Sequence, residues 1–399
     1  MKMKRPALGT LLVTLTMLAT SGCGITGATV DKASGPGVTD TQIKIGTTNP
    51  LTGPVAASCK PVSDGALAWF NYVNNHGGIN GRKIVDQVLD DAFTAPEALS
   101  NVRQFVNAGV LAVFGGCGSV QPPAILPELA KNGIPYLFPY ASSTTLEASG
   151  YKRLFLVLPS YGHQLAGLIK TAMHELGPGS VWFANAQIPG SDQTEQQVRQ
   201  AVQEAGGTYL GGETTIVGTS DYTPLVLKMK AARPDYVVLS QGAPDAARIV
   251  QTMAAQNALP KKRILGQANL ATAPFVGSVG DIATGRVLTV SPVELATSEA
   301  AASCRKAFAK ASPPLTAEGY SLFGCGTAQI MTEALREAGK NLTRERLVQI
   351  LRSWQEKKAS PIFPAVTFGA SGNLGVTRMI LVEIQGGQLA SKGELEIAP

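Results

Sequence analysis

Short apolar runs alternate with amphipathic stretches of helical length along most of this chain, and the alternation falls into two blocks. In the first block, the pattern predicts one strand that begins at Ile43 and three more over 82–90, 110–115 and 134–139. It also predicts helices over 64–75, 95–108 and 123–132. The second block predicts helices over 163–176, 192–205, 222–232 and 244–257, with strands over 181–185, 208–217, 235–240, 263–267 and 286–290. Strands separated by helices pair in parallel through right-handed crossovers. We therefore predict an α/β fold with two doubly wound parallel-sheet lobes.

The segments that follow the predicted strands have a shared composition. They are rich in Gly, Ser, Thr, Asn, Gln and Pro and poor in charge, and they cover 49–59, 115–121, 139–145, 185–191, 240–245 and 266–272. Ligands of open parallel sheets bind outside the carboxyl ends of the strands. These segments therefore predict a cleft built from backbone amides, hydroxyls and side-chain amides.

The N-terminal segment predicts export. Lys2, Lys4 and Arg5 precede an apolar stretch over 7–19 that is too short to span a bilayer, and small residues then lead to Cys23. This pattern predicts a lipoprotein signal peptide over 1–22, with Cys23 as the lipidated new N-terminus. The alternative is an ordinary signal peptide with Cys23 incidental. Residues 23–39 are mostly small and polar and predict a flexible tether, so we expect an extracytoplasmic protein anchored by lipid to the cell membrane.

Charge and motifs exclude several functions. The formal net charge of +6 includes three basic residues of the signal peptide, so the mature chain carries 6 − 3 = +3. Charges of both signs are scattered, which argues against nucleic acid as a partner. The sequence contains no phosphate loop, no C-x-x-C and no G-x-S-x-G, so we expect no cofactor, no metal and no catalytic residues.

Four cysteines remain after Cys23, and their number suggests disulfides. Cys59, Cys117, Cys304 and Cys325 allow three pairings in an oxidising compartment. Cys117 also lies in a glycine-rich segment after a predicted strand, which makes it a candidate thiol nucleophile with His163 as its base. A disulfide at Cys117 is the favoured interpretation.

Asp90 and Asp91 are adjacent carboxylates at the end of a predicted strand. Neighbouring residues of an extended chain point to opposite faces, so the two side chains cannot readily share a proton. We interpret the pair as a solvated strand end or a helix cap rather than a catalytic dyad.

Several short motifs stand out along the chain: 37–46 (GVTDTQIKIG), 50–54 (PLTGP), 77–83 (GGINGRK), Asp90-Asp91, 114–116 (FGG), Gln121-Pro122 and 133–135 (GIP). Taken together, they resemble motifs of the branched-chain amino-acid (Leu/Ile/Val) binding proteins of ABC importers. The resemblance runs from about Val38 to the C-terminus and is looser in the second half.

The resemblance implies a type I periplasmic-binding fold with three crossovers between the lobes, near Ser160, Pro292 and Phe368. Lobe one would then comprise 40–160 and 292–367, and lobe two 161–291 and 368–399. It also implies a monomer whose lobes close on a ligand at the hinge, and a closed form that the ABC permease recognises.

The same resemblance implies the ligand-binding residues. Loops that hold a carboxylate in the family fall on Cys117, Gly118 and Ser119 and on Tyr140, Ala141, Ser142 and Ser143. The full set of candidates is completed by Ser58, Tyr161, Pro189, Gly242, Gln267 and Ala268.

The second lobe departs from the family pattern. Two aromatic residues of the family pattern are missing here: the first is replaced around Pro189 and the second by Gly242. The acid that pairs with a ligand ammonium in the family is replaced around Gln267–Asn269. Unless Asp192, Asp221 or Asp245 substitutes for that acid, a buried ammonium would lack a counter-ion. We predict a bulkier, less zwitterionic ligand than leucine, such as an aromatic or aliphatic acid or amide.

The family frame also predicts the disulfide pairs. In a sheet of strand order 2-1-3, the loops after the first and third strands are neighbours, which brings Cys59 near Cys117. Cys304 and Cys325 lie on successive helical segments over 299–311 and 320–338. We expect these two pairs and a binding protein rather than an enzyme. A ligand-sensing receptor module and a thiol-dependent hydrolase using Cys117 are the alternatives.

Overall fold

The structure is a computed structural model that describes residues 35–369 and 373–397. The predicted signal peptide, the lipidation site Cys23 and most of the predicted tether lie outside these residues. The last part of that tether, 35–39, instead contacts the first lobe. The backbone N–H of Gly35 donates to the carbonyl of Leu342 at 3.0 Å, and Val38 is buried. Any tether is therefore shorter at this end than predicted.

The first sheet is parallel and has the strand order β2-β1-β3-β4-β5. β1 pairs with β2 along its whole length, from Gln42 opposite Lys83 to Asn49 opposite Asp90. The strands are β1 (Gln42–Asn49), β2 (Lys83–Asp90), β3 (Val113–Phe114), β4 (Tyr136–Leu137) and β5 (Leu154–Phe155). The order β2-β1-β3 is the one on which the Cys59–Cys117 pairing was predicted.

The second sheet has the order β12-β11-β10-β9-β8-β6-β7 and is mixed rather than purely parallel. Its parallel strands are β6 (Ser180–Ala186), β7 (Thr208–Thr215), β8 (Tyr236–Ser240), β9 (Arg263–Gly266) and β10 (Val287–Ser291). β11 (Arg378–Gln385) runs antiparallel to β10, and β12 (Gln388–Glu396) runs antiparallel to β11. The all-parallel expectation is wrong at this edge, because Gly386 and Gly387 both have positive φ and form a two-residue hairpin turn.

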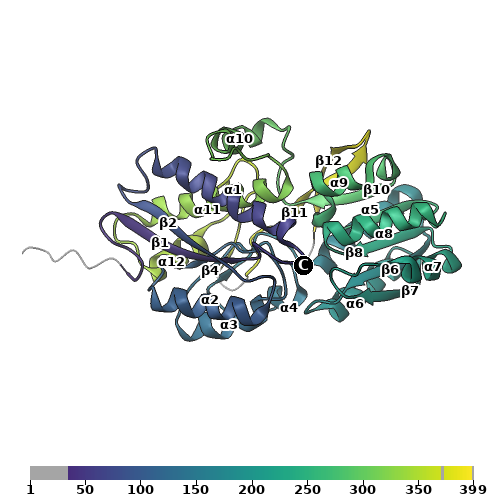
Figure 1. The fold of residues 1–399 in the computed structure, drawn as a ribbon, viewed down its shortest axis with the longest axis horizontal. Helices are drawn as coiled ribbons and strands as arrows, with labels where there is room; N and C mark the ends of the chain where they lie inside the picture. The colour runs from purple at the N-terminus through teal and green to yellow at the C-terminus, as the bar shows by residue number, and fades with distance from the viewer. Residues whose placement is uncertain (1–34, 370–372, 398–399) are drawn as a thin grey trace, which may run out of the picture. The chain divides into compact units, whose positions relative to one another are not determined.

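Helices cover both faces of the first sheet (Figure 1). α1 and α11 pack on one face, where Trp69 Nε1 of α1 donates to Thr332 Oγ1 of α11 at 3.2 Å, and α2 and α3 pack on the other. This sheet and its helices form the first lobe. Its helices are α1 (Ala56–Asn74), α2 (Ala95–Asn107), α3 (Pro122–Lys131), α4 (Thr144–Glu147), α10 (Ala302–Ala309), α11 (Gly319–Ala338) and α12 (Arg344–Ser353).

The second sheet and its helices form the second lobe. α5 and α6 pack together, whereas the side chains of α7, α8 and α9 bury a separate apolar cluster. These helices are α5 (Tyr161–Leu176), α6 (Ser191–Glu204), α7 (Thr223–Ala232), α8 (Ala243–Ala255) and α9 (Ala273–Val279). Short 3-10 helices cover Ala268–Leu270, Gly280–Ala283 and Glu299–Ala301.

α1 begins at Ala56, eight residues before the predicted start, and contains Pro61. The predicted start at Asp64 rests on the helical spacing of the apolar residues that follow it, a pattern that does not extend back through Pro61. Tertiary contacts stabilise the additional turns: Asn49 Nδ2 donates to the carbonyl of Cys59 at 3.0 Å and lies 3.1 Å from Ser63 Oγ.

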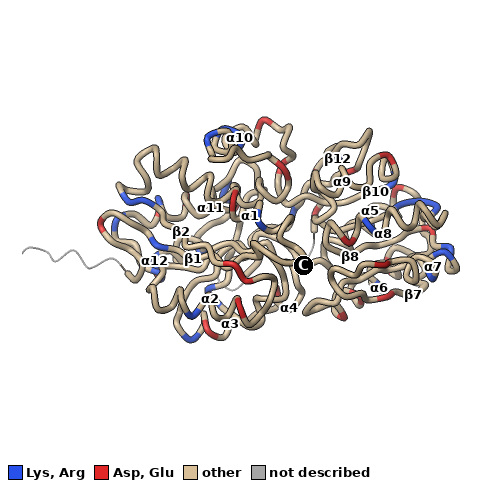
Figure 2. The backbone as a smooth tube through the Cα atoms, in the orientation of Figure 1, with Lys and Arg blue, Asp and Glu red and all other residues tan. Residues whose placement is uncertain are grey.

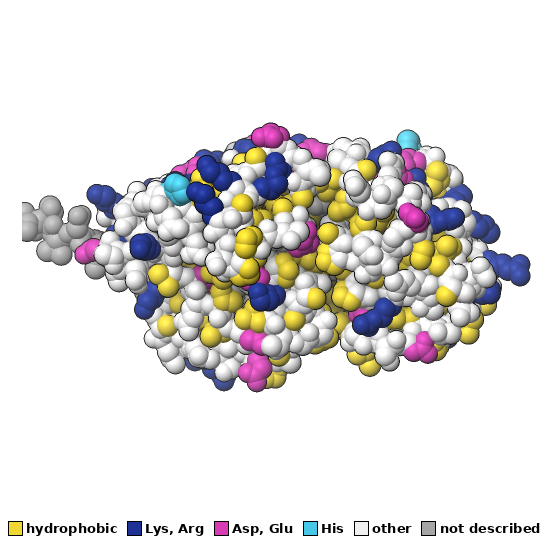
Figure 3. All heavy atoms as spheres, turned by 45° about the horizontal axis from the view of Figure 1, so that its top comes forward, with side chains coloured by type: hydrophobic (Ala, Val, Ile, Leu, Met, Phe, Trp, Pro, Cys, Tyr) yellow, Lys and Arg dark blue, Asp and Glu magenta, His cyan; other side chains and the backbone are white. Residues whose placement is uncertain are grey.

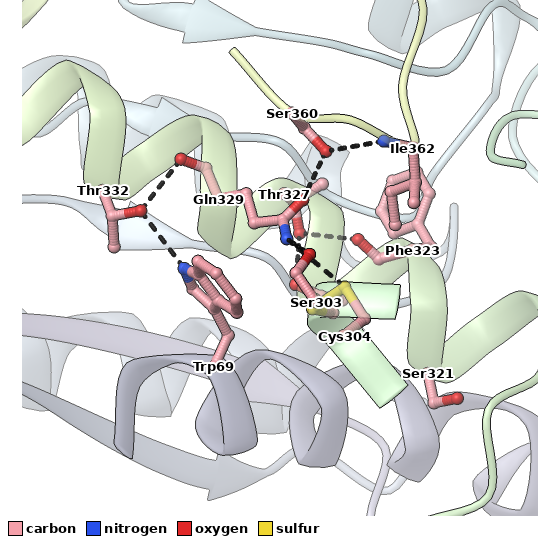
Figure 4. The surroundings of a disulfide bond; sticks show 12 residues. Trp69, Ser303, Cys304, Ser321, Phe323, Thr327, Gln329, Thr332, Ser360 and Ile362 are labelled. Atoms are coloured by element: carbon pink, nitrogen blue, oxygen red, sulfur yellow. Dashed lines mark hydrogen bonds between the residues drawn. A yellow bond between two sulfur atoms is a disulfide. The ribbon is translucent and has the colours of Figure 1, made fainter. Parts of the chain in front are cut away.

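Two disulfides join Cys59 to Cys117 and Cys304 to Cys325, the two pairs expected. The second is fully buried beside a polar network (Figure 4). Gln329 Nε2 donates to Ser303 Oγ at 2.9 Å, and Ser360 Oγ donates to Gln329 Oε1 at 2.6 Å. These bonds tie the short α10 and the segment around Ser360 to the long α11.

Charged residues are scattered along the helices and loops of both lobes (Figure 2), and the face drawn in Figure 3 shows side chains of both signs interspersed. Within the described residues, no helix has both the length and the apolar character required to cross a bilayer.

Candidate ligand-binding site

A cavity of about 600 Å³, including part of its open mouth, lies where loops from the two lobes meet. The loops that line it follow the carboxyl ends of β1, β2, β3, β4, β6, β7, β8 and β9. Parallel strands place these loops at one edge of each sheet, and this is the position that the strand order predicts for a ligand. The first-lobe lining residues are Val55, Ser58, Cys59, Phe93, Cys117, Gly118, Ser119, Tyr140 and Tyr320, and those of the second lobe are Tyr161, Ala186, Ile188, Val217, Ser240, Gln241, Gly242, Pro244, Gln267 and Asn269.

The cavity lining carries no ionic side chain. Among the described residues that form it, none is Asp, Glu, Lys, Arg or His. The polar atoms are hydroxyls of Ser and Tyr and amides of Gln and Asn, and they are set among aromatic and aliphatic groups. Such a lining can recognise a ligand by hydrogen bonds and apolar contact. Its hydroxyl and amide N–H groups can donate to a carboxylate or amide oxygen, but it offers no carboxylate to pair with an ammonium group.

Three buried tyrosines and Asn269 form the polar centre of the site. Tyr140 Oη donates to Asn269 Oδ1 at 3.1 Å, so this bond joins the two lobes. The Tyr161 hydroxyl interacts with Ser119 and Asn269, and the Tyr320 hydroxyl interacts with Ser58. Burial raises the pKa of all three phenols above its ordinary value, so they stay neutral and can donate hydrogen bonds at physiological pH.

On the second lobe, hydrogen bonds to neighbouring groups hold the side-chain amides of the cavity wall in place. Ser240 Oγ donates to Gln267 Oε1 at 3.1 Å, and Gln267 Nε2 donates to the carbonyl of Gln241 at 3.3 Å. Asn269 Nδ2 donates to that same carbonyl at 3.2 Å. The Gln241 side-chain oxygen is buried and has no hydrogen-bond partner. The side chains of this wall are therefore held in place by hydrogen bonds, and the Gln241 side-chain oxygen is left to accept one more.

On the first lobe, the Cys59–Cys117 disulfide forms part of the cavity wall. It ties the first turn of α1 to the loop after β3. Cys117 is bonded to Cys59, so it is not a free thiol, and the hypothesis of a catalytic Cys117 is wrong. Its proposed base is also engaged elsewhere, because His163 Nδ1 lies 3.2 Å from Glu147 Oε1 and the residue does not line the cavity.

The structure places eight predicted ligand-binding residues in the cavity wall: Ser58, Cys117, Gly118, Ser119, Tyr140, Tyr161, Gly242 and Gln267. It does not place the other five there, namely Ala141, Ser142, Ser143, Pro189 and Ala268. Whether any residue of the wall binds a ligand stays a prediction.

The three first-lobe residues that were predicted to bind the ligand but do not line the cavity make contacts within the fold instead. Ala141 is buried in an apolar cluster beneath α3. Ser142 donates its backbone N–H to Ser119 Oγ at 3.3 Å, and its own hydroxyl accepts from Gln164 Nε2 at 3.4 Å. Ser143 Oγ accepts from the backbone N–H of Leu146 at 3.2 Å and caps α4. The polar groups of Ser142 and Ser143 are therefore engaged in hydrogen bonds within the fold.

On the second lobe the prediction is off by one residue in two places. Ile188 lines the cavity instead of Pro189, and Asn269 does so instead of Ala268. The N–H of Ala268 donates to Gln164 Oε1 at 3.0 Å as the chain enters a 3-10 turn, which directs the next side chain to the cleft. A turn of this kind leaves no periodic signal in the sequence.

The acids considered as replacement ammonium partners do not reach the cavity. Asp245 is buried beside Gly218 and Arg248, accepting at 2.9 Å from the N–H of Gly218. Asp221 accepts from the N–H of Thr223 at 2.8 Å, and Asp192 is exposed in the first turn of α6.

Asp90 and Asp91 are not both at a solvated strand end. Burial opposes ionisation of Asp90, but hydrogen bonds from Leu51, Thr52 and Ala92 lower its pKa to about 2. Asp91 is only 1 % exposed, and burial raises its pKa. It accepts from Thr48 Oγ1 at 2.8 Å and from Gln121 Nε2 at 3.1 Å. The solvated interpretation is wrong for Asp91, because α2 and the loop after β3 cover it.

Sequence analysis also missed part of the cavity wall. The missed residues are Val55, Cys59, Phe93, Ala186, Ile188, Val217, Ser240, Gln241, Pro244, Asn269 and Tyr320. Most lie within or beside the segments singled out at the strand ends. Tyr320 lies at the start of α11, far along the chain, and no local pattern indicates that it reaches the cleft.

Comparisons with known proteins agree with this geometry. A sequence profile described as periplasmic binding protein matches residues 42–388. A Leu/Ile/Val-binding protein of Rhizobium johnstonii is 22% identical over 350 residues, covering 88% of this chain and 94% of its own. A leucine-, isoleucine-, valine-, threonine- and alanine-binding protein of Pseudomonas aeruginosa is 26% identical over 252 residues, covering 62% of this chain and 66% of its own.

Solved structures with the same fold are named for different ligands. A fatty acid ABC transporter substrate-binding protein from Thermomonospora curvata has a TM-score of 0.82 at 20% identity, covering 92% of this chain and 95% of its own. A branched chain amino acid ABC transporter protein from Thermus thermophilus, with bound valine, has a TM-score of 0.80 at 19% identity, covering 90% and 98%. The likeness establishes the type I periplasmic-binding fold.

Proposed function

This chain belongs to the periplasmic binding protein family, and we propose that it captures a small molecule with a carboxylate or amide group on an apolar body for an ABC importer. The observation that carries the proposal is the cavity between the lobes, which is lined by hydroxyls, amides and aromatic groups and by no ionic side chain among the described residues. We infer that binding, not catalysis, is the role of this cavity.

The lining argues against leucine-like amino acids as ligands. Their ammonium group would be buried without a carboxylate partner, at a cost on the order of several kcal/mol. A ligand with one polar end avoids this cost, because its oxygen atoms can accept from Tyr and Ser hydroxyls or from Asn269. The uncharged remainder would then contact Phe93, Ile188 and Val217.

We propose that ligand binding closes a hinge between the lobes. The chain passes from the first sheet to the second after β5, returns after β10 and crosses again before β11. These passages agree with hinge segments near Ser160, Pro292 and Phe368. Residues of both lobes line the cavity, so a ligand that contacts both favours the closed form.

We also propose that the protein acts as a monomer outside the cytoplasm, held at the membrane by lipid on Cys23 and recognised by the ABC permease. Family membership supports the extracytoplasmic location. Mass spectrometry of the N-terminal peptide tests the anchor: the expected species begins at Cys23 and carries diacylglycerol, and an unmodified peptide beginning elsewhere would reject it.

The ligand proposal is tested by thermal unfolding in the presence of a metabolite library, followed by isothermal titration calorimetry of every stabilising compound. A ligand that binds only the native state raises the melting temperature. We expect aliphatic or aromatic acids and amides to stabilise the protein, and leucine and valine to give no heat of binding. Tight binding of leucine or valine would overturn the proposal.

A further inference from the structure

The turn after β2 contains two consecutive residues in a conformation that L-amino acids rarely adopt. Ala92 has φ 48° and Phe93 has φ 62°. Neither is glycine or asparagine, the residues that tolerate left-handed backbone best. Such a conformation persists only where surrounding contacts over-determine it, and it is concentrated at functional sites.

Asp90 and Asp91 supply those contacts. Asp90 Oδ1 accepts from the N–H of Ala92 at 2.9 Å, and Asp91 Oδ1 accepts from the N–H of Phe93 at 2.9 Å. Each aspartate therefore holds the backbone of the residue two positions later. Asp91 is itself fixed by Thr48 and Gln121, so it has little freedom to release Phe93.

The held backbone places the Phe93 side chain at the ligand cavity. Phe93 lines the cavity and belongs to none of the buried apolar clusters of the first lobe. A Cβ atom on Gly118 would lie 2.8 Å from Phe93 Cε2 and 2.6 Å from Gln121 Oε1. Gly118, with φ 118°, therefore leaves the space that the aromatic ring occupies.

Resting on the proposed function of the cavity, we propose that Phe93 is a specificity-determining wall for the apolar part of the ligand, and that Asp91 is its positioning residue. The ring limits the length or bulk of the ligand on the first-lobe side. Asp91 acts through the backbone of Phe93 and does not touch the ligand. A ring in the hydrophobic core would serve stability, whereas a partly buried ring at the cavity serves recognition.

The positioning role is tested without any ligand, by fluorine NMR of protein with para-fluorophenylalanine at position 93. We expect one resonance well separated from that of the urea-unfolded protein. Asp91→Ala is expected to move it toward the unfolded position. Asp91→Asn is expected to restore it, because the Asn side-chain oxygen can still accept from the N–H of Phe93.

Two further variants keep this test decisive. Gly118→Ala is expected to displace the ring, and with it the resonance, even if Asp91→Ala does not fold. Thr343→Ala removes the cap of α12, where Thr343 Oγ1 accepts from the N–H of Arg346, and leaves the contacts of both aspartates in place. It should lower stability without moving the resonance. An unchanged resonance in Asp91→Ala, when that variant folds, would overturn the positioning role whatever Gly118→Ala does. If Asp91→Ala does not fold, an unchanged resonance in Gly118→Ala would overturn the placement of the ring on which that role depends.

The specificity role is tested with linear carboxylates from butanoate to dodecanoate and their primary amides, scored by thermal shift and calorimetry. We expect Phe93→Ala to move the preferred chain length upward and Phe93→Leu to give an intermediate preference. In Phe93→Ala, the difference in affinity between compounds that differ by one methylene should become smaller, since one methylene is worth roughly 10-fold or more in a shaped apolar pocket.

The outcomes separate the two proposals. Binding by the wild type with the same length preference in Phe93→Ala would overturn the specificity role alone. If no compound of the series stabilises the wild-type protein, the proposed ligand class fails and the specificity role fails with it. The fluorine spectra still decide whether Asp91 holds the ring.

Discussion

At the scale of single residues, Asp86 has a carboxyl group whose ionisation is opposed by burial. It lies in β2, and its two carboxylate oxygens are 3.0 and 2.9 Å from Thr47 Oγ1. Burial raises the pKa of Asp86 from 3.8 to about 7, and the hydrogen bond from Thr47 opposes this only in part. The folded protein therefore retains a proton that the unfolded chain releases.

This difference predicts a pH-dependent effect of Asp86→Asn. Between about pH 4 and pH 7 the native state binds more protons at this position, so its stability falls as pH rises. Asn cannot ionise and can still accept from Thr47. We therefore expect Asp86→Asn to raise the melting temperature relative to wild type more at pH 8 than at pH 4.5, measured by differential scanning calorimetry. The exposed Asp40→Asn is the control, and a pH-independent difference for Asp86→Asn would contradict the prediction.

At the scale of elements, the two disulfides have different surroundings. Cys59–Cys117 closes a loop with a sequence separation of 58 and lines the cavity, linking α1 to the loop after β3. Cys304–Cys325 closes a loop with a separation of 21 between α10 and α11, away from the cavity wall. Removing one disulfide or the other can therefore separate an effect on stability from an effect on ligand binding.

We predict that replacing either pair by serine lowers stability, by about 4 kcal/mol for Cys59–Cys117 and about 3 kcal/mol for Cys304–Cys325 in the chain-entropy model. Only the first replacement should also weaken binding of the compound identified by thermal shift, because it frees a wall of the cavity. Urea unfolding and calorimetry provide the two measurements. Equal loss of affinity in both double variants would show that the disulfides act only through global stability.

At the scale of the whole described molecule, loops from the two lobes meet beside the cavity mouth. A Cβ atom built on Gly218, after β7, lies 3.6 Å from Pro54 Cβ, after β1. This separation lies within the range that a disulfide spans. Tyr140 and Asn269 form a hydrogen bond between the same lobes.

We therefore predict that the double variant Pro54→Cys, Gly218→Cys forms an additional disulfide that locks the lobes together. The stabilising compound should accelerate its formation, because binding increases the closed population. Peptide mapping under mild oxidation measures the cross-link. The variant Pro54→Cys, Asn257→Cys, with an exposed second site, is the control. A cross-linking rate unaffected by the compound would argue against ligand-driven closure.

The sequence predicted most elements because their local signals agree. Periodicity located the major helices and most strands, and strand ends located the loops that line the cavity. The resemblance also led to both disulfide pairs. The hairpin of β11 and β12 was missed although Gly386-Gly387 between two alternating stretches indicates one.

By itself, the sequence determined two parallel-sheet units and the family, because patterning and motifs are local properties of the chain. Only the tertiary structure decided which side chains face the ligand cavity. Asn269 rather than Ala268 lines it because a 3-10 turn follows β9, and Tyr320 lines it because α11 packs on α1. Phe93 lines it because Asp90 and the buried Asp91 hold a left-handed turn. Each of these also depends on contacts between distant segments, such as those of Asp91 with Thr48 and Gln121, and no local pattern contains them.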